Sequence, residues 1–402
     1  MISIRGIRLI DGTGADPVER TDLTIEDDRI TEVGAASRAE STLDLDGLTV
    51  MPGLIDAHAH LGLVDLSEEG VYEAPAVVAA QIFAVASQAL DQGFTTVRDA
   101  GGIDGGVARA QREGLIRGPR IFPSGPIHCQ TGGHGDLRQP FDHHAVHGVP
   151  GLVTPSRTVD GPDEMRRAVR EAFRHGATQI KVAVSGGATS LTDAIEDVQL
   201  TIDELRAAVE EASARSTYVT AHAHNVAGIR NGLEAGVRCF EHASQLDEET
   251  AEMIRAQDAA IVPTLVVLEQ MESHWEEWGV TKESLIRGRM LAAAMQKAVR
   301  IAHDAGLTMG SGSDLLGTSQ DHRAREIALK ADIIGAMPAI VSATRTNAQI
   351  IGIAETTGAI ASGMRADLIA VDGDPLEDPR VLDDPDKIVV VIQGGVVVKD
   401  LR

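Results

Sequence analysis

Short apolar runs alternate with amphipathic stretches through the middle of the chain, over roughly residues 51–360. Short buried runs followed by segments with a 3.6-residue period are typical of parallel strands that alternate with helices. The expected strands lie within Leu54–Leu61, Phe94–Ala100, Arg120–Gly125, Gln179–Ser185, Tyr218–His224, Arg238–Ser244, Ala259–Leu265 and Leu307–Asp314. The expected helices include 74–93, 161–176, 201–216 and 246–258, and glycines stand at helix ends where C-caps are expected: Gly93, Gly176, Gly236 and Gly306.

This alternation predicts an α/β fold in the form of a (β/α)8 TIM barrel. A doubly wound parallel sheet has the same alternation, so the pattern alone leaves both architectures open.

The two ends of the chain have a different pattern, with short alternating runs separated by turns. Residues 23–26 alternate before an Asp27-Asp28 turn, and Gly394-Gly395 separates two runs near the C-terminus as a hairpin turn would. Neither end alone has enough strands for a stable sheet. We therefore expect one small β-sandwich domain, built from residues 1–50 and 361–402 together, with the barrel of residues 51–360 inserted between them.

Composition narrows the function. The chain has 402 residues, of which 43% are hydrophobic, 24% charged and 2% aromatic, and its formal net charge is −24. Nucleic-acid and anionic-membrane binding both need a basic face, so neither partner is expected. With two cysteines, no basic and apolar leader and no apolar run of about 20 residues, we expect a soluble, reduced, cytoplasmic protein with a small-molecule substrate.

Side chains that can bind a metal recur where the expected strands end. Side chains two residues apart on a strand point the same way, so His58 and His60 form a pair of imidazole ligands. An isolated His-x-His would more often be two half-buried histidines, but other candidates lie on later expected strands: Lys181, His222, His224, His242 and Asp314. Active sites of barrels gather at this face, so these side chains are expected to meet.

Lys181 requires a separate argument because an ammonium has no lone pair for a cation. Burial beside metal ions would lower the pKa of its amine. The neutral amine can add carbon dioxide, and the resulting carbamate is a carboxylate on a long arm that could bridge two cations. Alone, Lys181 would be interpreted as a packed stem with its head paired to an acid; within this set of ligands the bridging interpretation is preferred.

The chain resembles the amidohydrolase superfamily, in particular the group that contains imidazolonepropionases and metal-dependent Xaa-Pro dipeptidases (prolidases). The resemblance spans nearly the whole chain through a series of motifs in order: PGLIDAHAH, GFTTVRDAGG, TGGHGD, IKVAVSGG, VTAHAH, EHAS, GSD and GMRADLIAVDGDPLED. No single motif is specific for this superfamily, but the combination of motifs in this order is.

The resemblance implies a two-metal site, usually zinc. His58 and His60 would hold one metal together with Asp314, His222 and His242 would hold the other, and N6-carboxylated Lys181 would bridge them. A hydroxide shared by the two ions would attack a carbonyl carbon, while Asp314 takes its proton and passes it to the leaving nitrogen.

Two more histidines are candidates for contact with substrate. His134, in the long loop 126–150 expected over the site, would donate to the substrate carbonyl as charge builds. His224 faces the same way as His222 and could replace it as a ligand. Related dipeptidases often carry Tyr at this position as a substrate contact, so we assign His224 to the substrate side; this difference weakens the case for peptide specificity.

Several other residues have structural interpretations. Arg98 and Asp99 are expected to pair at the mouth of the barrel. His175 and His303 are expected near helix C-termini. Trp275 and Trp278 are expected to pack in the core, with a pocket-lining role as the alternative. The remaining histidines of the long loop are expected to be loop or lid residues: His143, His144 and His147.

The favoured function is hydrolysis of an amide bond, in a dipeptide or an N-acyl amino acid. The first alternative is a cyclic amide, carbamate or urea as substrate on the same site. A deaminase is disfavoured, because such enzymes commonly use one metal and lack the bridging lysine. A non-catalytic binding protein is disfavoured because the ligand set is complete. Related enzymes often form homo-oligomers, and the sequence leaves the number of subunits open.

Overall fold

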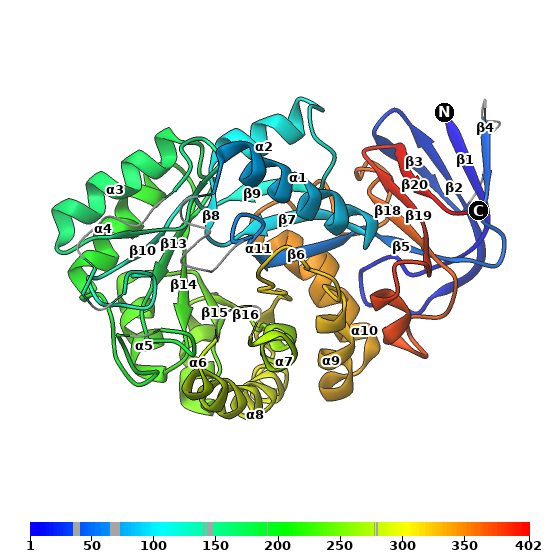
Figure 1. Ribbon diagram of the computed structural model, residues 1–402. Helices are drawn as coiled ribbons and strands as arrows, with labels where there is room; N and C mark the ends of the chain where they lie inside the picture. Colours follow the sequence, from blue (N-terminus) through cyan, green and yellow to red (C-terminus); the bar gives the residue numbers. More distant parts are fainter. Residues whose placement is uncertain are drawn as a thin grey trace.

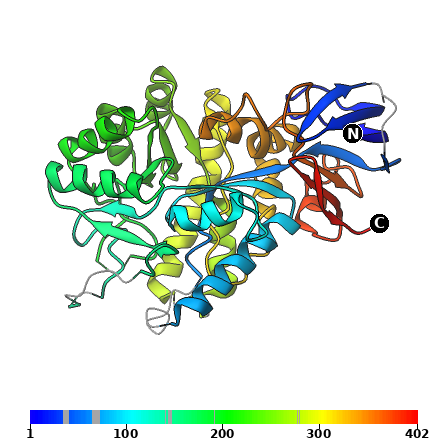
Figure 2. The same cartoon turned by 90° about the horizontal axis from the view of Figure 1, so that it is seen from above.

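The computed structural model describes residues 1–34, 41–64, 73–139, 141–142, 148–190, 192–276, 278 and 280–402. Figure 1 shows a body of parallel strands and helices with a separate, mostly antiparallel sheet beside it, and Figure 2 shows that this sheet lies at one end of the molecule. Both chain termini lie in this end sheet. No helix within the described ranges is long and apolar enough to cross a membrane.

The end sheet combines strands from both termini. Its strands are β1 (Ile2–Leu9), β2 (Val18–Glu26), β3 (Arg29–Val33), β4 (Ser41–Asp44), β5 (Thr49–Pro52), β18 (Leu368–Val371), β19 (Ile388–Gln393) and β20 (Val396–Asp400). The order is β20-β19-β18-β5-β1-β2-β3, with β4 also paired to β1. The predicted turns at Asp27-Asp28 and Gly394-Gly395 join β2 to β3 and β19 to β20. Positive φ values of 55° and 77° at the two glycines allow the tight second hairpin.

The body contains two sheets whose main strands run parallel. One has the order β6-β7-β9 and the other β12-β10-β13-β14-β15-β16-β17. Their strands are β6 (Leu54–Ala59), β7 (Phe94–Asp99), β9 (Arg120–Pro123), β10 (Ile127–Cys129), β12 (Ser156–Thr158), β13 (Ile180–Ala183), β14 (Val219–Ala223), β15 (Cys239–His242), β16 (Ala260–Val262) and β17 (Thr308–Met309). Each of the apolar runs predicted as strands contains one of them. A short ribbon also forms from β8 (Gly102–Ile103) and β11 (Val153–Thr154).

Backbone hydrogen bonds connect the two body sheets at both sides. Ala57 N donates to Ser311 O at 3.0 Å just after β17, and Thr178 N donates to Pro123 O at 2.8 Å between β9 and β13. The prediction of a loop over all of 126–150 is wrong at its start, because Ile127–Cys129 forms β10 and pairs with β13. His143, His144 and His147 lie outside the described residues.

Helices fill the positions between strands and cover the sheets. They are α1 (Pro75–Asp91), α2 (Gly105–Arg112), α3 (Pro162–Arg174), α4 (Ile202–Ser213), α5 (Val226–Ala235), α6 (Glu248–Ala256), α7 (Leu265–His274), α8 (Lys282–Asp304), α9 (Arg325–Ile334), α10 (Ala336–Val341) and α11 (Asn347–Ile351), with a π segment at Ser342–Thr346 and a 3-10 turn at Pro379–Asp383. The four glycines expected at helix ends all have positive φ. His175 caps α3 and His303 lies in the last turn of α8, as predicted.

The main apolar core lies between the seven-stranded sheet and its helices. It includes Met165 of α3, Ile180 of β13, Leu205 of α4 and Phe240 of β15, all buried. A second cluster joins the end sheet to the body, with Met51 and Ile369 on one side and Leu90 and Phe94 on the other. Trp278 packs against Val267 and Met271, which agrees with the core role predicted for it.

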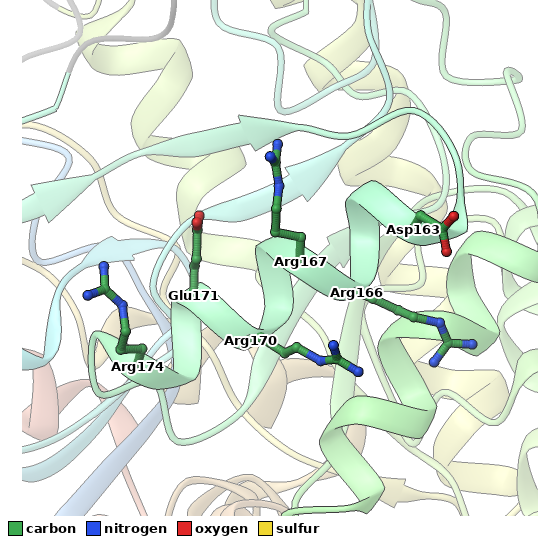
Figure 3. Close-up of a pocket in the computed structure, with 6 residues that line it drawn as sticks. All are labelled: Asp163, Arg166, Arg167, Arg170, Glu171 and Arg174. Carbon is green, nitrogen blue, oxygen red and sulfur yellow. The ribbon is translucent and has the colours of Figure 1, made fainter.

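A hollow on the outer face of α3 is lined by charged side chains, drawn in Figure 3: Asp163, Arg166, Arg167, Arg170, Glu171 and Arg174. Arg166 and Arg170 point toward α4, where they pair with Glu210 and Glu211 at 2.6 Å each. Arg157 pairs with Glu171 from the other side. These ion pairs tie α3 to its neighbours, and none of the predicted site residues lines this hollow.

Candidate metal centre

The strand ends bring His58, His60 and Asp314 together. His58 Nε2 lies 3.2 Å from His60 Nε2 and 3.3 Å from Asp314 Oδ1, and His60 Nε2 lies 3.1 Å from the same oxygen. Tetrahedral ligands at about 2.0–2.1 Å from a zinc ion are about 3.3 Å apart. The three atoms therefore have the spacing of ligands around one small cation.

The histidines of this group are held through their other ring nitrogens. His58 Nδ1 lies 2.7 Å from Glu241 Oε2, and His60 Nδ1 lies 2.8 Å from Gly101 O. A second-nitrogen partner fixes the orientation and tautomer of a metal-binding imidazole. Sequence reasoning did not identify Glu241, although a charged residue inside an apolar strand was a signal that could have found it.

His242 reaches the group because the backbone turns. Along β15 the side chain of Phe240 packs in the helix-facing core, while Cys239 and Glu241 face the opposite side. Strict alternation would send His242 toward the helices, but its φ of 67° reverses the direction. His242 Nδ1 then lies 3.9 Å from Asp314 Oδ2, and ligand atoms of His58, His242 and Asp314 all lie within 4.8 Å of one another.

Asp314 also has a left-handed backbone, with φ of 56°, and its N–H donates to His58 O at 2.8 Å. Such conformations carry strain that the surroundings must support, and they are frequent at functional sites. The support here includes Asp56, which accepts hydrogen bonds from the backbone N–H groups of His58 at 3.1 Å and Ser313 at 3.0 Å.

Further histidines surround this group. The His222 ring centroid lies 4.7 Å from that of His242 and 3.8 Å from that of His134, and the His224 ring lies 4.6 Å from His222. His242 Nδ1 lies 2.7 Å from Thr264 Oγ1, and His224 Nδ1 lies 2.8 Å from Ser244 Oγ. Burial lowers the pKa of His222, His224 and His242, so these rings are neutral and each keeps a lone pair.

Lys181 is buried on β13, where it pairs with Thr220, two residue pairs before the Ala183–His222 pair of the β13–β14 register. Burial lowers the pKa of its amine, against the opposing charges of Glu241 and Asp314. Asp314 behaves in the opposite way: burial acts to raise the pKa of its carboxyl, but His58, His60 and His242 outweigh it, and the pKa is well below the usual value. The low pKa means that the Asp314 carboxyl is ionised at neutral pH. Its side chain is 16% exposed, so a substrate can reach it.

The predicted Arg98–Asp99 ion pair is wrong. Neighbouring residues on a strand point to opposite sides, and Arg98 pairs instead with Glu241 at 2.6 Å. Asp99 accepts backbone hydrogen bonds from Leu61 at 2.8 Å and Gly101 at 3.1 Å. Burial raises the pKa of Asp99 to about 6.

A buried group of imidazole and carboxylate side chains at the ends of parallel strands is the type of site found in metal-dependent enzymes. The sequence matches the model of the amidohydrolase family over residues 49–398, and the chain belongs to this family, which is generally metal-dependent.

Known proteins agree with this assignment. Ochratoxinase of Aspergillus niger is 34% identical over 411 residues, covering 97% of this chain and 85% of that protein. A prolidase structure complexed with N-methylphosphonate-L-proline matches with a TM-score of 0.93 and 37% identity, over 99% of both chains. A Xaa-Pro dipeptidase structure with bound methionine matches with a TM-score of 0.85 and 29% identity, also over 99% of both. The chain is therefore similar to the prolidase-like group, and its homologues indicate a hydrolase.

Proposed function

We propose that this protein is a metal-dependent amidohydrolase that cleaves the amide bond of a dipeptide or an N-acyl amino acid. The observation that carries the proposal is the spacing of His58 Nε2, His60 Nε2 and Asp314 Oδ1, at 3.1–3.3 Å from one another. The prolidase and Xaa-Pro dipeptidase among its structural relatives support peptide-like substrates.

The donor set fits two divalent ions, for which zinc is the choice best suited to imidazole and carboxylate ligands. His58, His60 and Asp314 would hold one ion, and His222 and His242 the other. When bound, such ions supply a water that is nucleophilic at neutral pH and polarise the substrate carbonyl.

Lys181 would bridge the two ions as its N6-carboxylate. Its burial and lowered amine pKa favour the neutral form that adds carbon dioxide. The carbamate would also replace a buried cation by an anion between the ligands, which removes the repulsion that an ammonium would exert on bound metal.

Asp314 is the general base in this proposal. Its low carboxyl pKa keeps it ionised at neutral pH, and its partial exposure lets it take a proton from the attacking water and deliver it to the leaving nitrogen. His134 would donate a hydrogen bond to the substrate carbonyl, and His224 would contact the substrate beside it.

We also propose that the two body sheets together form the (β/α)8 barrel of residues 51–360, closed by the hydrogen bonds from Ala57 to Ser311 and from Thr178 to Pro123. Residues 1–50 and 361–402 would then be the composite β-domain. In such a barrel all the candidate ligands stand at the C-terminal face, where catalytic residues assemble.

A hydrolysis screen of the zinc-loaded protein tests the function. N-acyl amino acids and dipeptides, including Xaa-Pro dipeptides, are compared with lactams, carbamates and ureas, and Asp314→Asn serves as the inactive reference. We expect turnover of linear amides that Asp314→Asn abolishes. Turnover of only the cyclic amides, carbamates or ureas would replace the proposed substrate class, and no turnover of any compound would reject the proposal.

A further inference from the structure

Two loops meet beside His222 of β14, and one of them carries His134. Residues 130–136 follow β10, and residues 185–190 and 192–200 follow β13. His134 N donates to Gln199 Oε1 at 2.9 Å, and Gln199 Nε2 donates to Asp193 Oδ2 at 2.7 Å. Asp193 also accepts the N–H of Gly187 at 3.3 Å. The backbone of His134 is therefore tied to the second loop through a chain of buried polar groups.

The ring of His134 is confined as closely as its backbone. It stacks on the His222 ring with 3.8 Å between centroids and 18° between planes. A Cβ at Gly187 would lie 2.3 Å from both Cε1 and Nδ1 of the ring, closer than real contacts allow. Position 187 therefore admits only glycine while the ring keeps this place.

One ring nitrogen has a side-chain partner. His134 Nδ1 lies 2.7 Å from Ser190 Oγ, and the Ser190 backbone carbonyl is itself held by Arg287 of α8 at 3.2 Å. Within the part of the chain that the structure describes, His134 Nδ1 is the only hydrogen-bond partner of the Ser190 hydroxyl. A hydroxyl that donates to Nδ1 leaves the ring proton on Nε2.

We propose that Ser190 is a positioning residue, which donates its hydroxyl proton to His134 Nδ1 and so keeps His134 as the Nε2–H tautomer. In that state the ring presents a hydrogen-bond donor rather than a lone pair on the nitrogen that Ser190 does not contact. This inference rests on the proposed function for its consequence, since the Nε2–H group is the donor offered to a substrate carbonyl as negative charge develops on its oxygen. Gly187 contributes to the same positioning, because its lack of a side chain leaves room for the His134 ring.

The kinetic test compares Ser190→Ala, Ser190→Thr and the matched control Thr192→Val. Thr192 Oγ1 also bridges the two loops, donating to Gly132 O at 3.1 Å, but it does not contact His134. We expect Ser190→Ala to lower kcat about tenfold or more, with KM and metal content nearly unchanged. Ser190→Thr keeps the hydroxyl and should retain kcat, as should Thr192→Val. An equal loss in Thr192→Val would assign the effect to general loop bracing and overturn the proposal.

A double-mutant cycle tests whether Ser190 acts through His134. His134→Ala alone should lower kcat by about 10²–10³. Adding Ser190→Ala to His134→Ala should cost nothing further. A Ser190→Ala loss of the same size in both backgrounds would reject the inference.

The tautomer can be measured without any substrate. Long-range ¹H–¹⁵N spectra distinguish Nε2–H from Nδ1–H imidazole, and the His134 signals are assigned by their absence in His134→Ala. We expect Nε2–H in the native protein and a change in tautomer population in Ser190→Ala. Observation of Nδ1–H in the native protein would overturn the inference and leave the proposed hydrolase activity untouched. A native protein that has Nε2–H but no hydrolase activity would reject the proposed function and leave the role of Ser190 in fixing the tautomer intact.

Discussion

Glu241 Oε2 accepts a hydrogen bond from His58 Nδ1 at 2.7 Å, with both side chains buried. Burial acts to raise the pKa of the Glu241 carboxyl, but the charge of Arg98 outweighs it and the pKa is held well below the usual value. Arg98 is in turn bonded to Tyr218 Oη at 3.2 Å and to Ala57 O. Because Glu241 is ionised, the proton of this bond stays on Nδ1, and Nε2 of His58 turns its lone pair toward His60 and Asp314.

Glu241→Gln should therefore weaken metal binding. A glutamine lacks the negative charge that fixes the His58 tautomer, and loss of such a partner typically lowers metal affinity about 10- to 100-fold. Metal retention during dialysis against a graded chelator measures the effect. Glu113→Gln is the matched control, since Glu113 forms an exposed ion pair with Arg109 far from the site. Equal metal retention in the two variants would contradict this role for Glu241.

Lys181→Ala should abolish activity and reduce the amount of bound metal, because the bridging ligand is lost. A short-chain carboxylic acid added to this variant should restore part of both, since it can occupy the place of the carbamate. Elemental analysis and turnover are measured with and without the acid. The exposed Lys297 of α8 gives the control variant Lys297→Ala. Full turnover by Lys181→Ala would remove the lysine from the mechanism.

Arg323→Met should destabilise the fold. Arg323 and Asp56 form an ion pair with side chains 0% and 1% exposed, and Asp56 also accepts from Ser313 Oγ at 2.6 Å. Removing one partner of a buried pair typically costs about 3–5 kcal/mol in the free energy of unfolding. The exposed Arg380–Asp332 pair provides the comparison, because Arg380→Met should cost about 0–1 kcal/mol. Urea unfolding measures both, and similar costs would be inconsistent with the buried pair being the stronger support.

Glu326 should make stability depend on pH. Burial raises the pKa of this carboxyl from 4.5 to about 8, against the opposing charge of Lys330. Between these values the unfolded chain has released the proton while the folded chain keeps it, so this group makes the free energy of unfolding fall as pH rises. Lys330, whose pKa burial lowers to about 8, acts in the opposite direction only above that pH.

Glu326→Gln removes this titration while keeping an oxygen to accept from Val266 N, a bond of 2.8 Å in the native protein. The stability of the variant relative to the native protein should therefore increase steadily between about pH 5 and pH 8. Urea midpoints at several pH values measure this difference. A difference that does not change with pH would show that Glu326 does not titrate in this range.

The apolar pattern was enough to locate the parallel strands, because each predicted apolar run is short and is separated from the next by a helix with a 3.6-residue period. The apolar pattern could not predict which residues of each run form strand hydrogen bonds, or with which partners. The run Leu307–Asp314 contains only two residues of strand, Thr308–Met309, and its later part is held by backbone hydrogen bonds that join Ser311 and Asp314 to Ala57 and His58 of distant β6. Ile127–Cys129 was assigned to a loop because Pro126, Gly and His dominate its surroundings, whereas tertiary pairing to β13 makes it a strand.

The candidate ligands could be predicted because the spacing of the histidines and the order of the motifs are visible in the sequence itself. Their supporting partners could not. Glu241 was not among the predicted site residues, and the left-handed backbone that turns the neighbouring His242 toward the site is invisible in the sequence. The sequence predicts an ion pair between the neighbours Arg98 and Asp99. Side chains alternate along a strand, however, and the Arg98 guanidinium contacts Glu241 of β15 instead.

The composite end sheet has a consequence for biosynthesis. Strand β5 pairs with β18 through Val50–Ala370 and Thr49–Val371, so the edge of β5 that β18 covers stays open until residues 368–371 have left the ribosome. An mRNA truncated before the codon of Leu368 would release a chain with that edge permanently exposed, ready to add a strand from a neighbouring molecule. Synthesis of residues 368–371 and protection of this edge from aggregation are therefore coupled in this topology.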